Sequence, residues 1–216
     1  YLERKAKLYV IAGDKEKAIG VYQDLLAYGK AIAGHEKADW EMRAEALEEW
    51  GLYLFYCRDL KPAIKILKQS MKIRVKQGLD FENTGTHLAV AYYLRKEYTK
   101  AAKIARQVMA EVRSEERYLS FVTLAPVRMV YRAQLYMCLQ DYTKMKELLQ
   151  RVSTIPKCKH CTHTRCSEAM IVWGMYEEAQ GHTQKALEYY REGLSYDPWD
   201  QELVLAIRNL DRHAEE

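Results

Sequence analysis

The sequence has no long apolar stretch. Its longest apolar runs, near residues 88–94 and 169–176, fall well short of the roughly 18 to 20 residues that a helix needs to cross a bilayer. It also lacks, at its beginning, the basic segment followed by an apolar one that marks a secretory signal peptide. We therefore predict no membrane span. Because the chain starts at Tyr1, inside sequence of helical character and without an initiator methionine, we interpret it as a fragment of a longer protein.

The short motifs of the common enzyme classes are missing as well. The sequence contains no glycine-rich phosphate loop, no H-E-x-x-H metal pair, no G-x-S-x-G nucleophile turn and no dinucleotide-binding fingerprint. Adjacent carboxylates occur at 48–49, 115–116 and 177–178, but neighbours on a helix diverge by about 100°, so we interpret them as solvent-facing charge. We predict that the chain is not an enzyme.

A strong net charge of either sign is also absent, since the formal balance is only +4. Such a balance predicts a nucleic-acid partner only where basic residues gather on one face. One segment does align them along one side of a helix, with Lys61, Lys65, Lys68 and Lys72 followed by Arg74 and Lys76. We interpret this row as the solvated face of an amphipathic helix whose buried face carries Ile64, Leu67 and Met71. An acidic partner or a phosphate backbone is the alternative.

What the sequence does contain is a pattern that returns five times. Each copy has a small residue, a second position twelve residues later and a third position four residues beyond that. The first positions are Ala6, Gly51, Ala89, Ala133 and Gly174; the second are Ala18, Ala63, Ala101, Met145 and Ala186; the third are Tyr22, Leu67, Ala105, Leu149 and Tyr190. Self-similarity of this kind indicates stacked helical hairpins, in which each hairpin completes the core of its neighbour.

This pattern predicts an all-α chain that forms a single domain over 1–216. Five hairpins are expected at about 1–34, 39–78, 82–114, 118–155 and 166–197, with a capping helix at about 199–213. Their helices are predicted at 1–12 and 15–33, 39–57 and 60–77, 82–95 and 98–113, 118–139 and 142–154, and 166–180 and 183–196. The capping helix has one apolar stripe, formed by Leu203, Ile207 and Leu210, which suits the end of such a stack.

These positions resemble the tetratricopeptide repeat (TPR) family. The fifth copy carries the family's residue types at its spacings, with Trp173-Gly174, Gly181, Ala186, Tyr190 and Pro198. The resemblance implies a right-handed α-α superhelix, a TPR-like solenoid that serves as a protein-interaction module. Successive second positions are 45, 38, 44 and 41 residues apart, whereas the family's usual period is about 34. The chain therefore resembles a long-helix variant of the family.

In that family, the first helix of each hairpin lines a concave groove that binds partners. By position, the resemblance places nine residues there: Leu52, Phe55, Tyr56, Val90, Tyr93, Leu94, Gln134, Met137 and Met175. This aromatic and methionine-bearing set suits an apolar peptide or an amphipathic helix; the alternative is that these residues form plain core. Family members that grip a C-terminal carboxylate use Lys and Asn in this groove. Glu48, Leu52, Thr86 and Val90 stand at those positions and argue against such a partner.

A local cluster adds a second candidate site. Three of the five cysteines and two of the six histidines lie within residues 158–166. Cys158, Cys161, His163 and Cys166, with His160 as an alternate, are the ligand types of a structural Zn²⁺ site. The basic residues beside them favour the thiolate form that binds metal. A disulfide within the C-x2-C pair, or reduced thiols without metal, are the alternatives that the sequence leaves open.

The remaining cysteines indicate the redox state of the cellular compartment in which the protein is found. Cys57 and Cys138 fall in apolar helical stretches, where small core residues are expected, and the odd total favours a reducing, cytoplasmic compartment. The predicted function is a scaffold that binds a peptide or helix of a protein partner, without nucleic acid or membrane. The alternatives are a ligand- or peptide-sensing domain of a signalling or transcription protein, and a non-catalytic accessory domain of an enzyme.

Overall fold

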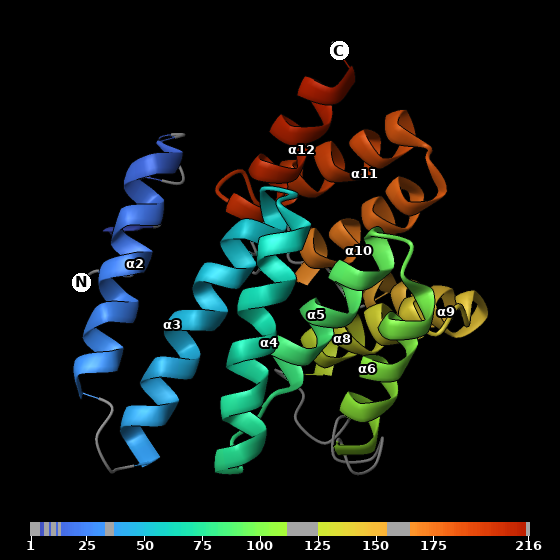
Figure 1. Cartoon of the computed structure of the whole chain (residues 1–216). Helices are drawn as coiled ribbons and strands as arrows, with labels where there is room; N and C mark the ends of the chain where they lie inside the picture. Colours follow the sequence, from blue (N-terminus) through green and yellow to red (C-terminus); the bar gives the residue numbers. More distant parts are fainter. Residues whose placement is uncertain are drawn as a thin grey trace. The chain divides into compact units, whose positions relative to one another are not determined.

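In the computed structural model, residues 5–6, 9, 12, 14–32, 37–111, 125–154 and 165–214 are described. All regular structure in these ranges is helical (Figure 1), and the all-α class is confirmed. The helices are α2 (Lys15–Ile32), α3 (Lys37–Tyr56), α4 (Leu60–Gln77), α5 (Glu82–Leu94), α6 (Tyr98–Glu111), α8 (Ala125–Cys138), α9 (Tyr142–Thr154), α10 (Arg165–Gln180), α11 (Thr183–Tyr196) and α12 (Gln201–Ala214).

The helix bounds lie close to those that the sequence predicts. Within the helix expected at 1–12, the described residues Lys5, Ala6, Tyr9 and Ala12 are helical. The helix expected at 118–139 is described as Ala125–Cys138, and the residues before it lie outside the described part of the chain.

The last helix starts two residues later than the sequence predicts. It begins at Gln201 because the carboxylate of Asp200 acts as its N-cap. That carboxylate accepts hydrogen bonds from the backbone amides of Glu202 and Leu203, at 3.0 and 3.2 Å. The carboxylate thus accepts hydrogen bonds from backbone amides that have no partner within the first turn of a helix.

The chain divides into two compact units, Tyr1–Leu88 and Ala89–Glu216, with the division inside α5. In the first unit, α3 packs against both α2 and α4, and these three helices lie side by side (Figure 1). In the second unit, α8 packs against α9, α10 against α11, and α11 against α12. Across the ranges described above, no helix is both long enough and apolar enough to traverse a bilayer.

Four turns between paired helices share one geometry. Each contains a residue with left-handed backbone: Arg58, Lys96 and Gln140 at φ 60°, and Gly181 at φ 83°. The amide of that residue donates to the carbonyl three positions back at 2.8–3.0 Å, and the next amide donates to the carbonyl five positions back at 2.9–3.0 Å. This is the Schellman motif, which satisfies carbonyls left over at the end of a helix.

The residue after the left-handed position is the last one before the next helix, and a side chain there can cap that helix. Asp14, which immediately precedes α2, caps that helix, since its carboxylate accepts a hydrogen bond from the amide of Lys17 at 3.2 Å and pairs with the Lys17 ammonium group. Hydrogen bonds from lysine lower the pKa of this carboxyl group and of Asp141, which has the same arrangement. Asp59 makes no such cap bond, because the residue three positions on is Pro62, which has no amide hydrogen.

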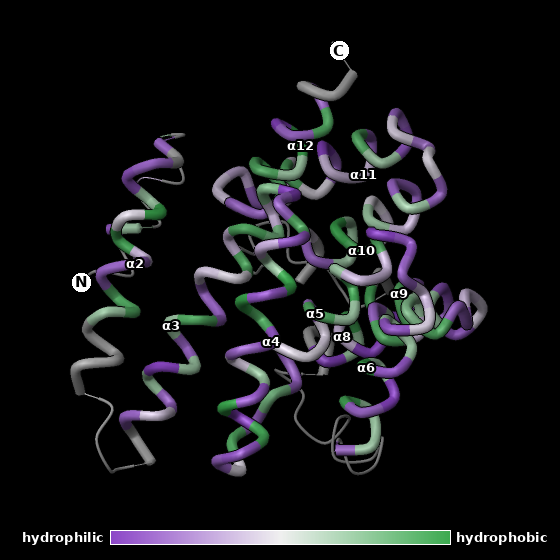
Figure 2. The backbone as a smooth tube through the Cα atoms, viewed as in Figure 1, coloured by the Kyte–Doolittle hydropathy of each residue, from purple (hydrophilic) through white to green (hydrophobic). Residues whose placement is uncertain are grey.

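The residues of the repeated sequence pattern form the core of the hairpins. All three positions of all five copies are buried. Two of the first positions are glycines because a bulky third position approaches them: a Cβ on Gly51 would stand 2.6 Å from Cδ2 of Leu67, and one on Gly174 would stand 2.1 Å from Cε1 of Tyr190. Polar positions face away from this core, so hydrophilic and hydrophobic stretches alternate along α4 (Figure 2). In the copies that contain Gly51 and Gly174, the large third position therefore packs against the small first position of its own hairpin.

Candidate functional site

The nine groove residues predicted from the family pattern lie mostly inside the helix packing. Leu52 and Leu94 are partly exposed. The other seven have relative exposures of 5% or less: Phe55, Tyr56, Val90, Tyr93, Gln134, Met137 and Met175. They come from α3, α5, α8 and α10. Their role in partner binding stays a prediction.

Several of these side chains make specific contacts with one another or with other core residues. The rings of Phe55 and Tyr56 lie 5.0 Å apart between centroids, and the Tyr56 hydroxyl hydrogen-bonds Nε2 of His87 at 3.0 Å. Burial lowers the pKa of His87, so its neutral form is favoured. The hydroxyls of Tyr93 and Tyr142 are hydrogen-bonded at 3.1 Å. The two hydrogen bonds join α3 to α5 and α5 to α9, and the rings that make them are packed between helices.

Glu48, at the head of the predicted groove, is buried with 8% exposure. Its carboxylate accepts hydrogen bonds from Asn83 and Thr84, and its Oε2 pairs with Nη2 of Arg74 at 2.9 Å. The prediction that this carboxylate faces solvent is wrong. A buried charge needs partners that replace water, and α4 and α5 supply them. The absence of a C-terminal carboxylate partner here stays a prediction.

The carboxylate of Glu177 was also predicted to face solvent, and this too is wrong, since Glu177 is 4% exposed. Nδ1 of His182 lies 2.8 Å from Oε2 and Nζ of Lys185 lies 2.6 Å from Oε1. Burial acts to raise the pKa of Glu177, but these two partners outweigh it and lower the pKa below its usual range. The pair at 115–116 lies outside the described residues.

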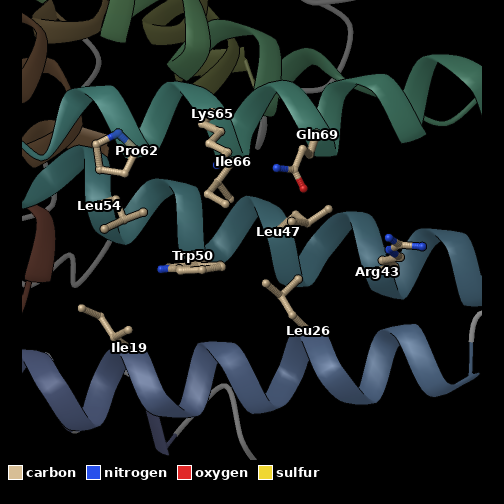
Figure 3. A pocket seen from close by; sticks show the side chains of 10 residues that line it. All are labelled: Ile19, Leu26, Arg43, Leu47, Trp50, Leu54, Pro62, Lys65, Ile66 and Gln69. Atoms are coloured by element: carbon tan, nitrogen blue, oxygen red, sulfur yellow. The ribbon is translucent and has the colours of Figure 1, made fainter.

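A pocket of about 370 Å³ lies in the first unit between α2, α3 and α4 (Figure 3). Its lining comprises Ile19 and Leu26 from α2, Arg43, Leu47, Trp50 and Leu54 from α3, and Pro62, Lys65, Ile66 and Gln69 from α4. In Figure 3, Ile19 and Leu26 extend from α2 toward α3, and the ring of Trp50 lies between them in this view. The volume falls in the range of roughly 300–1,000 Å³ that is typical of ligand sites.

The pocket lies on a different face of α3 from the predicted groove. Its α3 residues, Arg43, Leu47, Trp50 and Leu54, follow one another at helical spacings of four, three and four. At about 100° per residue, this stripe lies nearly opposite the predicted groove residues of the same helix. The spacing was visible in the sequence, but nothing in it showed that α2 and α4 leave space beside this stripe.

The polar groups of the pocket give it a chemical preference. The Nε1 of Trp50 is buried and has no hydrogen-bond partner among the described residues, although buried indole N–H groups usually find an acceptor. Arg43 and Lys65 supply positive charge, and none of the described lining residues is acidic. The pocket therefore combines apolar walls with hydrogen-bond donors and cations, an arrangement that suits an apolar group next to a negative one.

The predicted zinc ligands fall outside the side chains that the structure describes: Cys158, His160, Cys161, His163 and Cys166. Elsewhere, in the described residues, no group of three or more His, Cys, Asp and Glu side chains is placed to hold a metal ion. Cys138 is fully buried in α8, where burial raises the pKa of its thiol. That environment matches a small core residue. Zinc binding stays a prediction for the segment 158–166.

Comparisons with known proteins bear on the fold. No family model matches the chain. The sequence is 27% identical over 224 residues to the Hsp70-Hsp90 organizing protein 1 of Glycine max, with 96% of this chain and 37% of that protein covered. The chain thus spans little more than a third of the length of this relative. The relationship supports a TPR-like helical repeat.

A solved structure supports the same architecture. The crystal structure of BtubC (BKLC) from P. vanneervenii superposes with a TM-score of 0.57 at 14% identity, covering 88% of this chain and 76% of that one. At such low identity the likeness concerns the fold alone. It agrees with the all-α architecture built from helix pairs that the described residues form.

Proposed function

We propose that this chain is a non-catalytic protein-interaction scaffold and that a segment of a partner protein binds in the pocket between α2, α3 and α4. The observation that carries the proposal is the pocket itself, about 370 Å³ with a mainly apolar lining. Stacked helical hairpins commonly bind other proteins along their extended surfaces. The resemblance to a protein named as an organizer of Hsp70 and Hsp90 supports a protein as the class of partner.

The pocket supplies affinity through burial of an apolar side chain. Transfer of a Leu or Phe side chain from water to a fully apolar site is worth about 1.5–3 kcal/mol. Ile19 and Leu26 on one wall and Trp50 on the other are placed to cover such a side chain (Figure 3). A scaffold held open by packed helices loses little conformational freedom on binding, which preserves that gain. A ligand- or peptide-sensing role and an accessory role beside an enzyme are the alternative functions.

The proposal is tested by selecting peptides from a random displayed library on the full chain and measuring their affinity by calorimetry. Gln69→Trp changes an exposed lining residue and fills the pocket from its rim. We expect it to weaken binding by about tenfold, the equivalent of roughly 1.4 kcal/mol. Gln150→Trp, at an exposed position of α9, is the matched control and should bind normally.

Two results would contradict the proposal. One is a selection that enriches no peptide with measurable affinity. The other is a peptide whose affinity is the same for Gln69→Trp as for the unchanged chain. Circular dichroism of each variant establishes that the helices are retained before affinities are compared.

A further inference from the structure

We infer that the partner segment is acidic, with an apolar anchor side chain in the pocket and several carboxylates lying along α4. This inference rests on the proposed function and specifies the chemistry of the partner at the same site. Its starting point is the lysine row of α4, which a purely apolar binding site leaves unexplained.

The lysines of α4 form a continuous exposed row. All of them are solvent-exposed: Lys61, Lys65, Lys68, Lys72 and Lys76. α4 contains no Asp or Glu, so no carboxylate at i±3 or i±4 on this helix offsets their charge. Arg74 is different, because it pairs with the buried Glu48 and thereby serves the fold. The row is therefore positive charge that the hairpin itself does not use.

The row borders the pocket. Lys65 belongs to both, since it also lines the pocket, and Arg43 adds a second cation from α3. From Lys61 to Lys72 the row extends for about 16 Å along the axis, at 1.5 Å per residue. A single anionic group is too short to use that length. A peptide that carries one apolar side chain and several carboxylates matches both the pocket and the row.

The pocket favours a peptide over a nucleic acid. Nucleic-acid binding surfaces pair a basic track with open aromatic faces on which bases stack. Here the ring of Trp50 lies beside the aliphatic side chains of Ile19 and Leu26, which line the pocket from α2 (Figure 3). Aliphatic walls of this kind accommodate a Leu, Ile or Phe side chain. The cations at the rim then meet carboxylates that neighbour this anchor in the chain.

The test uses three sets of labelled peptides of equal length with the same central Leu-Phe-Leu, flanked by Glu, by Gln or by Lys. Their affinities for the full chain are measured by fluorescence polarisation at low and at physiological salt. We expect the Glu set to bind about tenfold more tightly than the Gln set at low salt, and the Lys set to bind weakest. The advantage of the Glu set should shrink as salt screens the charges.

Two double variants that change the net charge equally test whether the preference for the Glu set arises from the lysine row of α4. Lys65→Glu with Lys68→Glu reverses two neighbouring charges of the row, and we expect about a tenfold loss for the Glu set. Lys103→Glu with Arg106→Glu places the same change at the same spacing on exposed positions of α6. This control should leave the affinity within about twofold, because exposed charges away from the site contribute little.

The outcomes separate this inference from the proposed function. Equal binding of the Glu and Gln sets, lost in Gln69→Trp, overturns the acidic partner while the scaffold function stands. Failure of every set to bind contradicts both. A single-stranded RNA whose binding depends on Lys65 and Lys68 but is unaffected by Gln69→Trp would assign the row to a phosphate backbone and overturn the inference.

Discussion

At the scale of single residues, stability depends on matched sizes at the first and third positions of each repeat. Gly174 lies against Tyr190, whose hydroxyl also donates to Oε2 of Glu178 at 2.8 Å. The ring is thus held at both ends, by the close approach to the glycine and by the hydrogen bond. It has little room to move away from a new methyl group.

Gly174→Ala should therefore lower the free energy of unfolding by about 1–3 kcal/mol, the usual cost of an overpacked core. Gly20→Ala in α2 is the control, since no atom lies within 4 Å of a Cβ built there. It should be neutral or raise stability by about 0.5–1 kcal/mol, because alanine favours helix more than glycine does. Urea unfolding followed by circular dichroism measures both, and equal stability of Gly174→Ala and the unchanged chain would disprove the tight contact.

At the scale of elements, the turns determine where each helix ends. In the four turns between paired helices, three of the left-handed positions carry a side chain: Arg58, Lys96 and Gln140. Left-handed backbone costs a residue with a Cβ about 1–2 kcal/mol relative to right-handed backbone. The two hydrogen bonds of the Schellman motif hold these residues in that conformation despite the cost.

Lys96→Gly should raise the melting temperature, with a gain of up to about 1 kcal/mol, because glycine adopts the left-handed region without strain. Lys96 is exposed, so loss of its side chain removes little packing. The opposite change, Gly181→Ala, should lower stability by a similar amount. Lys103→Gly, in the interior of α6, controls for the general effect of glycine and should destabilise by about 1 kcal/mol. A lower melting temperature for Lys96→Gly would contradict the assigned turn.

The bounds of the helices could be predicted from the sequence because the residues that set them are close together in the sequence. The positions of small residues and the turn residues Asp14 and Asp59 lie within the hairpins that they define, so helix bounds followed closely. Burial of Glu48 was not predictable, since its partner Asn83 is 35 residues away in the sequence. The pocket was missed for the same reason, as it exists only where α2 packs beside α3 and α4.

At the scale of the whole molecule, each unit builds its own core, and the second unit contains the segment with the cysteine and histidine cluster. That segment connects Thr154, where α9 ends, to Arg165, where α10 begins. The two helices also contact each other. A metal bound within the segment would close a short loop between packed helices, and its binding free energy would then add to the stability of the fold.

We therefore propose, from the sequence, that elemental analysis of the purified chain finds about one zinc per chain and that a chelator lowers its melting temperature. Cys158→Ser with Cys161→Ser should remove the metal and reproduce the chelator's effect, because two of four ligands are lost. Cys57→Ser is the control and should retain the metal, since this residue directly follows α3, in the first unit. An absence of metal together with an unchanged melting temperature would contradict zinc binding. Mass spectrometry after alkylation would then distinguish a disulfide between Cys158 and Cys161 from reduced thiols, because only free thiols react.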